Sequence, residues 1–317
     1  MAAQDVETDV LSRLGRVARA VRTVDGRQLR HYARRMGFRA DGAAALWVIR
    51  TLKLIASPFE FVERRLAMRR VARNPAFARV LDERTGWGVL PPAALPGVER
   101  VIASAQRILR EYQDGTRDWG WQKKEFRKVI FGPEDLQAFP EVRDLILSEP
   151  VLQIASDYLG TVPILESVQI WWTPVNGNLE SSQLFHRDGI DFRQVKFLVN
   201  LNDVGPDSGP FCFLPADISA RLSGLIRNWR TRVDDEDIFR HAQPSDVVAA
   251  TGPAGSGYVV DSCRCFHYGS RARGGERLLL MFNFASYLCP LDAVMSAHLD
   301  ATPFRDDPVR RLVLKRA

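Results

Sequence analysis

The chain has 317 residues, of which 46% are hydrophobic and 26% are charged. This composition excludes disordered and fibrous proteins, and the length allows one large core or one core with an added module. The most apolar window, Ala43 to Ala56, is broken by Arg50 and Lys53, so we expect no membrane-spanning helix.

The number of cysteines and the first residues of the chain indicate the cellular compartment. No apolar signal stretch follows the first methionine, and acidic residues appear early, at Asp5, Glu7 and Asp9. Both features argue against a secretion signal, and a chain with so few cysteines needs no disulfide framework. We therefore expect a cytoplasmic protein. The four cysteines are Cys212, Cys263, Cys265 and Cys289.

The net charge of +6 is concentrated at the N-terminal end. Residues 1–80 hold 17 Arg and Lys against 7 Asp and Glu, which leaves an acidic remainder. Such a segment is suited to anionic lipid head groups, a phosphorylated substrate or nucleic acid, although a solvated helical face explains it as well. No zinc-finger spacing, aromatic RNA-binding signature or basic-region heptad accompanies the charge, so we expect no nucleic-acid partner. Peripheral membrane contact through residues 1–80 stays an alternative.

Residues 1–90 are expected to form a basic helical region. Leu46 to Ile55 and Phe61 to Ala72 are predicted to be helices, separated by Ser57 and Pro58. Prolines at 91, 92 and 96 then mark a soft boundary. The predicted division is thus 1–90 and 91–317. An amphipathic helix is also predicted earlier, from the apolar stripe Val6, Val10, Leu14, Val17 and Val21.

The next part of the chain alternates helices with one aromatic segment. Val98 to Tyr112, Glu141 to Leu147 and Val151 to Leu159 have helical patterns. Between the first two, Trp119 and Trp121 lie in a stretch that either covers the mouth of a site or packs its rings into the core.

After Gly160 the pattern changes to short β-branched or aromatic runs separated by turns. This arrangement predicts an α+β protein whose core is a β-sandwich or jelly roll. A polar, helix-prone insertion at about 216–245 interrupts the strands, and such insertions are often lids that select the substrate. The predicted strands are Ile164–Trp172, Gln183–His186, Gln194–Asn202, Gly209–Leu214, Gly257–Asp261 and Arg277–Ala285.

The chemistry centres on four residues in a fixed order. His186 and Asp188 lie two positions apart, a spacing that puts both side chains on one face of a strand. His267 follows 79 residues after Asp188, and Arg277 follows ten residues later. Two histidines and one carboxylate form a facial triad for non-haem Fe(II). An arginine beside it provides a fixed cation for a carboxylate of 2-oxoglutarate.

Each of these residues also has a simpler explanation. His267 is compatible with a half-buried structural histidine, and Arg277 with an ion pair at a strand edge. Cys263 and Cys265 with His267 could contribute to a zinc site, but the second cysteine pair expected of structural zinc is absent. The ordered set of four favours the iron site.

Three motifs together resemble the phytanoyl-CoA dioxygenase family, over roughly Glu141 to Ala285. They are His186-Arg187-Asp188, then Leu201-Asn202-Asp203-Val204 through Ser208-Gly209-Pro210 to Leu214-Pro215, and finally Cys265-Phe266-His267-Tyr268-Gly269-Ser270 with Glu276-Arg277-Leu278. The resemblance implies a double-stranded β-helix, a cupin-like jelly roll. It also implies Fe(II) bound by His186, Asp188 and His267, and 2-oxoglutarate bound by Arg277, with O2 as second co-substrate.

The chain departs from that family in two places. Thr173 stands where many relatives carry a lysine that contacts the co-substrate, and Pro215-Ala216-Asp217-Ile218 replaces a proline-glycine-serine-histidine ending. We place Thr173 and Gln169 among the candidate co-substrate contacts. The family's fatty-acyl substrate is not transferred to this chain.

These features predict a dioxygenase that hydroxylates a small or lipid-like molecule and releases succinate and CO2. A phosphate or another anionic group on the substrate is one alternative, because of the basic N-terminal region and the arginine-rich insertion. Asp188 favours hydroxylation over halogenation, since related halogenases lack this carboxylate. Two other functions remain open: a non-catalytic jelly-roll ligand-binding protein, and a membrane-surface adaptor that uses residues 1–80.

Overall fold

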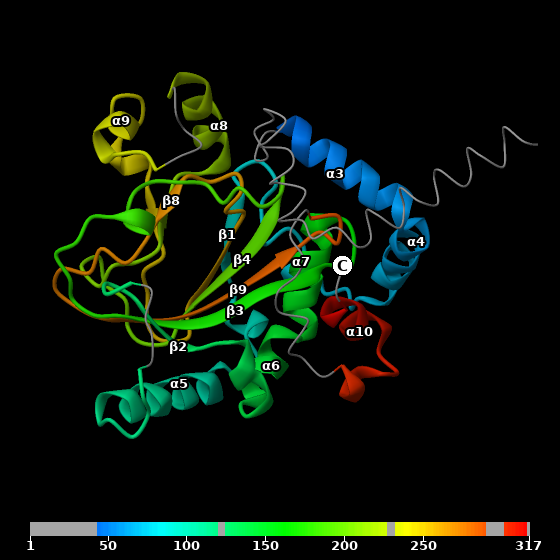
Figure 1. Ribbon diagram of the computed structural model, residues 1–317, viewed down its shortest axis with the longest axis horizontal. Coiled ribbons are helices and arrows are strands. Elements are labelled where there is room, and N and C mark those ends of the chain that lie inside the picture. The colour runs from blue at the N-terminus through cyan, green and yellow to red at the C-terminus, as the bar shows by residue number, and fades with distance from the viewer. Residues whose placement is uncertain (1–42, 120–123, 227–231, 290–300, 316–317) are drawn as a thin grey trace, which may run out of the picture.

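A computed structural model describes residues 43–119, 124–226, 232–289 and 301–315. The predicted apolar stripe from Val6 to Val21 and the predicted position of Trp121 lie outside these residues. Two antiparallel sheets form the centre of the molecule, and helices surround the larger one (Figure 1).

The larger sheet has six strands in the order β1-β7-β4-β9-β3-β2, and every neighbouring pair is antiparallel. The central strands β4 and β9 are buried along their whole length, because helices cover one face of the sheet and the smaller sheet covers the other. The six strands are β1 (Trp87–Leu90), β2 (Lys128–Phe131), β3 (Ile164–Thr173), β4 (Gln194–Asn200), β7 (Gly257–Val260) and β9 (Arg277–Ala285).

The smaller sheet has the order β6-β5-β8 and lies against the inner face of the larger one. Its strands are only two residues long: β5 (Cys212–Phe213), β6 (Val248–Ala249) and β8 (His267–Tyr268). Phe211 and Phe213 from its β5 side meet Leu279 and Met281 of β9 in a shared core. Two facing antiparallel sheets with surrounding helices confirm the predicted α+β class with a jelly-roll core.

Helices close the outer face of the larger sheet. Val101 and Ile108 of α5, Val151 of α7 and Leu312 of α10 are buried in the same core as Phe282 of β9. In Figure 1, α5 and α6 lie below β2 and β3, and α7 and α10 lie to the right. These helices are α5 (Val98–Gln113), α6 (Pro140–Ile146), α7 (Glu149–Leu159) and α10 (Pro308–Leu314).

The N-terminal described helices, α3 (Ala43–Ala56) and α4 (Pro58–Ala67), are attached to this body rather than separate from it. Arg64 of α4 is fully buried and donates to the carbonyl oxygens of Val162 and Pro163. β1 precedes the predicted boundary at residue 90, yet it pairs with β7. The main sheet therefore extends across that boundary.

The insertion at about 216–245 forms two helices, α8 (Ala216–Leu225) and α9 (Asp235–Phe239), which lie together beside β8 at the upper left of Figure 1. Its residues Leu222, Val233 and Ile238 pack against Phe185 and Phe266. A small core of its own therefore holds the insertion over the smaller sheet.

One predicted strand is wrong. Gln183–His186 is not a strand: a short 3-10 helix covers Ser181–Gln183, and Phe185 and His186 form only isolated β-bridges, to Val233 and His267. The alternating pattern is real, but each residue pairs with a different segment, so no continuous ladder forms.

No helix in the described part of the chain is both long and apolar enough to cross a membrane. Trp47, Ile55, Phe59 and Leu66 of α3 and α4 are nevertheless exposed. Contact of this region with a membrane surface stays a prediction.

Phe282 provides a test of the core. Its side chain is fully buried in the centre of β9 and stacks on Phe197 with ring centroids 4.8 Å apart. We expect Phe282→Ala to lower the free energy of unfolding by about 3–5 kcal/mol, because it leaves a cavity between two closed layers. Chemical denaturation measures this change. Phe59→Ala removes the same ring from a position that is 87% exposed, and it should cost no more than about 0.5 kcal/mol.

Candidate metal centre

The two histidines are brought together by their own backbones. His186 donates its N–H to the carbonyl oxygen of His267 at 3.0 Å, and His267 donates back to His186 at 2.8 Å. A third bond, from the Asp188 N–H to the Ser262 carbonyl at 2.9 Å, holds the same two segments one step further along. Backbone hydrogen bonds alone therefore hold these residues, which are distant in sequence, opposite each other.

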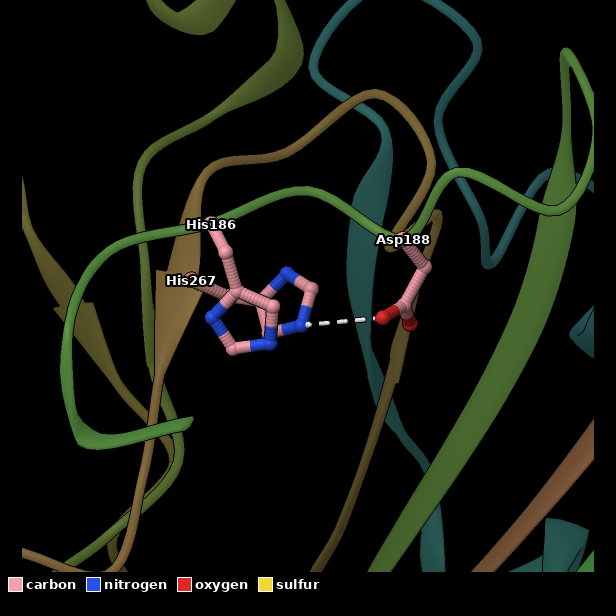
Figure 2. Close-up of side chains that lie close together, drawn as sticks. All are labelled: His186, Asp188 and His267. Atoms are coloured by element: carbon pink, nitrogen blue, oxygen red, sulfur yellow. Dashed lines mark ion pairs between the residues drawn. The ribbon is translucent and has the colours of Figure 1, made fainter. Parts of the chain in front are cut away.

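The side chains converge in the space between these segments (Figure 2). The imidazole centroids of His186 and His267 lie 4.3 Å apart, and Nε2 of His267 lies 3.8 Å from Oδ1 of Asp188. One ligand atom from each of the three residues lies within 4.8 Å of the others. Phe211 stacks on the His267 ring at 5.0 Å and limits its rotation.

Each imidazole is held in the tautomer that can bind a metal. Nδ1 of His186 lies 2.9 Å from the Leu184 carbonyl oxygen, and Nδ1 of His267 lies 3.0 Å from that of Cys265. A carbonyl can only accept, so Nδ1 carries the proton and Nε2 keeps its lone pair. Burial lowers the pKa of His186 to about 4 and that of His267 well below its usual value, so both rings are neutral at pH 7.

Asp188 is held in the charged form. Burial alone would raise its pKa, but the ammonium of Lys196 keeps it well below the usual value. Lys196 projects from β4 and donates to Oδ2 of Asp188 at 2.5 Å. The other carboxylate oxygen, Oδ1, faces His267. Two neutral imidazole nitrogens and one ionised carboxylate form a donor set that fits a facial 2-His-1-carboxylate metal site.

Arg277 lies at the N-terminal end of β9 and is fully buried. Its Nη2 donates to the Ser270 hydroxyl at 2.9 Å and is 3.5 Å from that of Thr173, while Nε and Nη1 have no hydrogen-bond partner among the described residues. Ser270 adopts a left-handed backbone, φ 66°, which costs energy for a residue other than glycine. Burial without a counter-ion lowers the pKa of Arg277 to about 10, so the guanidinium stays charged at pH 7.

The triad and Arg277 line one cavity of about 560 Å³ between the two sheets. Trp171 and Met281 from the larger sheet and Phe211 from the β5 side provide apolar wall, and Arg232 of the insertion reaches the same space. The other polar and charged lining residues are Lys124, Arg127, Glu166, Ser167, Gln169, Ser181, Ser182, Gln194, Lys196, Ser270 and Asn283.

The structure places the remaining predicted residues as follows. Gln169 lines the cavity and accepts from the Trp171 indole N–H at 2.8 Å, and Thr173 is buried beside Arg277. Trp119 is not among the residues that line this cavity: its ring packs on Tyr112 and Trp172 at the helical face of the sheet.

The cysteines are free and buried, as expected for apolar packing. Burial raises the pKa of the Cys263 thiol well above its usual value, which disfavours the thiolate that metal binding requires.

Sequence reasoning missed several residues of the site. Lys196 lies within an apolar strand run, and its orientation depends on which face of β4 meets the cavity. Ser270 ends the motif around His267, and nothing in its sequence context indicates a contact with Arg277. Arg127 precedes β2, a strand that was not predicted. In each case the signal was a polar residue beside an apolar run, which becomes informative only when strand register is known.

Asp261 supports the segment that leads to His267. Its carboxylate accepts from the Tyr158 hydroxyl at 2.6 Å and from the N–H groups of Cys263 and Gln194 at 3.1 and 3.2 Å. Burial raises the pKa of this carboxyl to about 6, because these bonds only partly replace the lost water.

The sequence matches no protein-family model and no curated protein sequence. Solved structures do resemble the fold. EctD from S. alaskensis, crystallised with 2-oxoglutarate and 5-hydroxyectoine, has a TM-score of 0.50 at 17% identity, over 68% of this chain and 79% of that one.

Two further structures score lower. HygX from Streptomyces hygroscopicus, with nickel and 2-oxoglutarate, has a TM-score of 0.45 at 19% identity over 68% of this chain and 88% of that one. SnoN, a non-haem α-ketoglutarate-dependent epimerase from nogalamycin biosynthesis, has a TM-score of 0.43 at 17% identity over 70% and 84%.

Asp261 gives a pH-dependence test. Its folded-state pKa lies above the value of about 4 in an unfolded chain, so the folded state binds the proton more tightly. The stabilisation is complete below about pH 4 and is lost as the pH rises through 6, by about 3 kcal/mol for a shift of about two units. Between pH 4 and 7, the unfolding free energy of wild type minus that of Asp261→Asn should therefore fall by that amount. A difference that stays constant between pH 4 and 7 would contradict this assignment.

Proposed function

We propose that the protein is an Fe(II)- and 2-oxoglutarate-dependent oxygenase that acts on a small molecule. One observation carries this proposal: two neutral imidazole nitrogens and an ionised carboxylate converge within 4.8 Å, in the same cavity as a buried arginine with two nitrogens that have no hydrogen-bond partner among the described residues. A mononuclear Fe(II) site needs the first group, and a dicarboxylic co-substrate needs the second.

His186, Asp188 and His267 are the proposed iron ligands. The carbonyl oxygens of Leu184 and Cys265 orient the two imidazoles, and Lys196 holds the second carboxylate oxygen of Asp188. Such outer partners fix the tautomer and direction of each ligand. Three protein ligands leave three coordination positions for exogenous groups, which is the arrangement that oxygen chemistry at iron requires.

Arg277 is the proposed partner of the distal carboxylate of 2-oxoglutarate. Its Nε and Nη1 have no hydrogen-bond partner among the described residues, and either can join the second N–H of Nη2 as a parallel pair of donors for a carboxylate. The hydroxyls of Ser270 and Thr173 lie next to Nη2. Thr173 therefore contributes a hydroxyl at a position where a lysine is common in the family that the sequence resembles. EctD, which shares the fold, was crystallised with 2-oxoglutarate and is consistent with this assignment.

In this reaction the bound iron supplies the oxidation: one oxygen atom of O2 enters succinate, released with CO2, and the other converts a substrate C–H into C–OH. The residues of the chain position the reacting groups and exclude water. Phe211 keeps the His267 ring in place, Trp171 and Met281 exclude water, and Arg277 fixes the co-substrate.

Hydroxylation is the proposed outcome because Asp188 is present and ionised. A halide ligand would need the position that this carboxylate takes. Chlorination of a substrate by purified protein supplied with iron and chloride would contradict this part of the proposal.

The first test is anaerobic addition of Fe(II) and 2-oxoglutarate, with the weak visible charge-transfer band of the chelate as readout. We expect the band in wild type and its loss in Asp188→Ala. Arg277→Gln should weaken 2-oxoglutarate binding about 30-fold or more, because a buried, bidentate, charge-assisted contact is lost.

Arg273→Ala is the matched control, since Arg273 lies on the same segment but is exposed and does not line the cavity. It should leave the band unchanged, and circular dichroism confirms that each variant is folded. Absence of the band in folded wild type would overturn the proposal and leave a jelly-roll ligand-binding protein.

A further inference from the structure

Arg127 occupies a second position in the cavity that the proposed iron and co-substrate sites do not use. It directly precedes β2, whose Lys128 is paired with Trp172 of β3. Its guanidinium lies over the Trp171 ring, with the central carbon 3.7 Å from the ring centroid. This contact holds a flat cation against the wall of the cavity at the β2 edge of the sheet. Arg277 lies on β9, on the other side of the same end of β3, and the positive charge of Arg127 contributes, after burial, to the lowering of its pKa.

This cation has no counter-ion in the described part of the chain. Its Nε is buried and makes no hydrogen bond there, and no ion pair between Arg127 and a described carboxylate is present. Burial lowers the pKa of Arg127 to about 10, so it still carries its charge at pH 7. A half-buried charge with a buried, unmet donor is costly, and a ligand that supplies the missing oxyanion recovers that cost.

The side chains that line the cavity carry more positive than negative charge. Five cationic side chains line it, namely Lys124, Arg127, Lys196, Arg232 and Arg277, against the carboxylates of Glu166 and Asp188. A divalent metal and a doubly charged co-substrate cancel each other. The lining therefore carries a net positive charge, and Lys196 and Arg277 already have roles in the proposed iron and co-substrate sites.

Glu166 does not correct the imbalance near Arg127. Its carboxylate accepts from Ser167 of β3, Asn283 of β9 and Gln194 of β4, at the end of β3 away from Arg127. Glu166 therefore forms no ion pair with Arg127. Lys124 and Arg232, in contrast, line the cavity from segments outside the sheet, as Arg127 does.

We infer that the substrate carries an oxyanion, a carboxylate or a phosphate monoester, which is received by Arg127. This inference rests on the proposed function for the reaction that the substrate undergoes. The anion-binding site at Arg127 does not depend on that function. The rigid guanidinium plane on Trp171 presents a fork of donors that matches either oxyanion, and Lys124 and Arg232 add positive potential. The apolar surface of Trp171, Met281 and Phe211 then faces the carbon skeleton between the anion and the triad.

The test uses probes with a common chain and different heads: hexanoate, hexyl phosphate and hexanamide. Calorimetry is done anaerobically on protein saturated with Fe(II) and 2-oxoglutarate, for wild type, Arg127→Gln and Arg127→Lys. We expect one or both anions to bind wild type at least about tenfold more tightly than the amide, the effect of one charge-assisted contact. Arg127→Gln should abolish this preference, and Arg127→Lys should keep part of it.

Lys128→Gln is the matched control, because it removes one positive charge at the adjacent position, whose side chain does not line the cavity. It should preserve the preference for an anion. The relative affinities of hexanoate and hexyl phosphate decide between the two head groups.

The inference is overturned if neither anion binds wild type more tightly than the amide, or if Arg127→Gln keeps the preference. It is also overturned if Arg127→Gln weakens the 2-oxoglutarate band as strongly as Arg277→Gln, because Arg127 would then hold the co-substrate. If wild type shows no band, the proposed function fails separately. The same probes are then applied to metal-free Arg277→Gln protein, in which Arg127 is tested on its own.

Discussion

The reciprocal backbone bonds between His186 and His267 are the constraint on which the candidate site depends. They fasten the loop that follows β3 to the segment that includes β8, and the bond from Asp188 to Ser262 extends the same pairing. The three side chains then need only ordinary rotamers to converge. Because a backbone pairing is shared by any residues at these positions, the geometry is a property of the fold, and the side chains determine what it binds.

The larger sheet provides Arg277, and the way this residue is held destabilises the folded state. Arg277 is buried at the start of a strand that is buried throughout, and two of its nitrogens have no hydrogen-bond partner in the described part of the chain. Ser270 beside it keeps a strained backbone. Both features oppose folding. They persist because the hydrophobic layers on either side of β9 stabilise the sheet that carries them.

The sequence predicted the long elements well because their periodicity is strong. The bounds of β9 agree with the prediction, and α5 differs by one residue. The two-residue strand β5 lies within the predicted strand Gly209–Leu214, whereas β6 and β8 were not predicted, because so short a segment has no period. The order of His186, Asp188, His267 and Arg277 predicted which residues meet. The roles of Lys196 and Arg127 depend on sheet register instead, which one sequence does not reveal.

Two of the contacts that attach the insertion lie at its α9 side, and they have an evolutionary consequence. Val233 pairs with Phe185, and Asp235 forms a bidentate ion pair with Arg271, whose guanidinium lies 3.6 Å over Tyr268. Both fastenings are next to the histidine segments, yet neither uses a proposed metal ligand. Substitutions in the insertion can therefore alter the rim of the cavity, where Arg232 lies, while the metal-binding geometry is inherited unchanged.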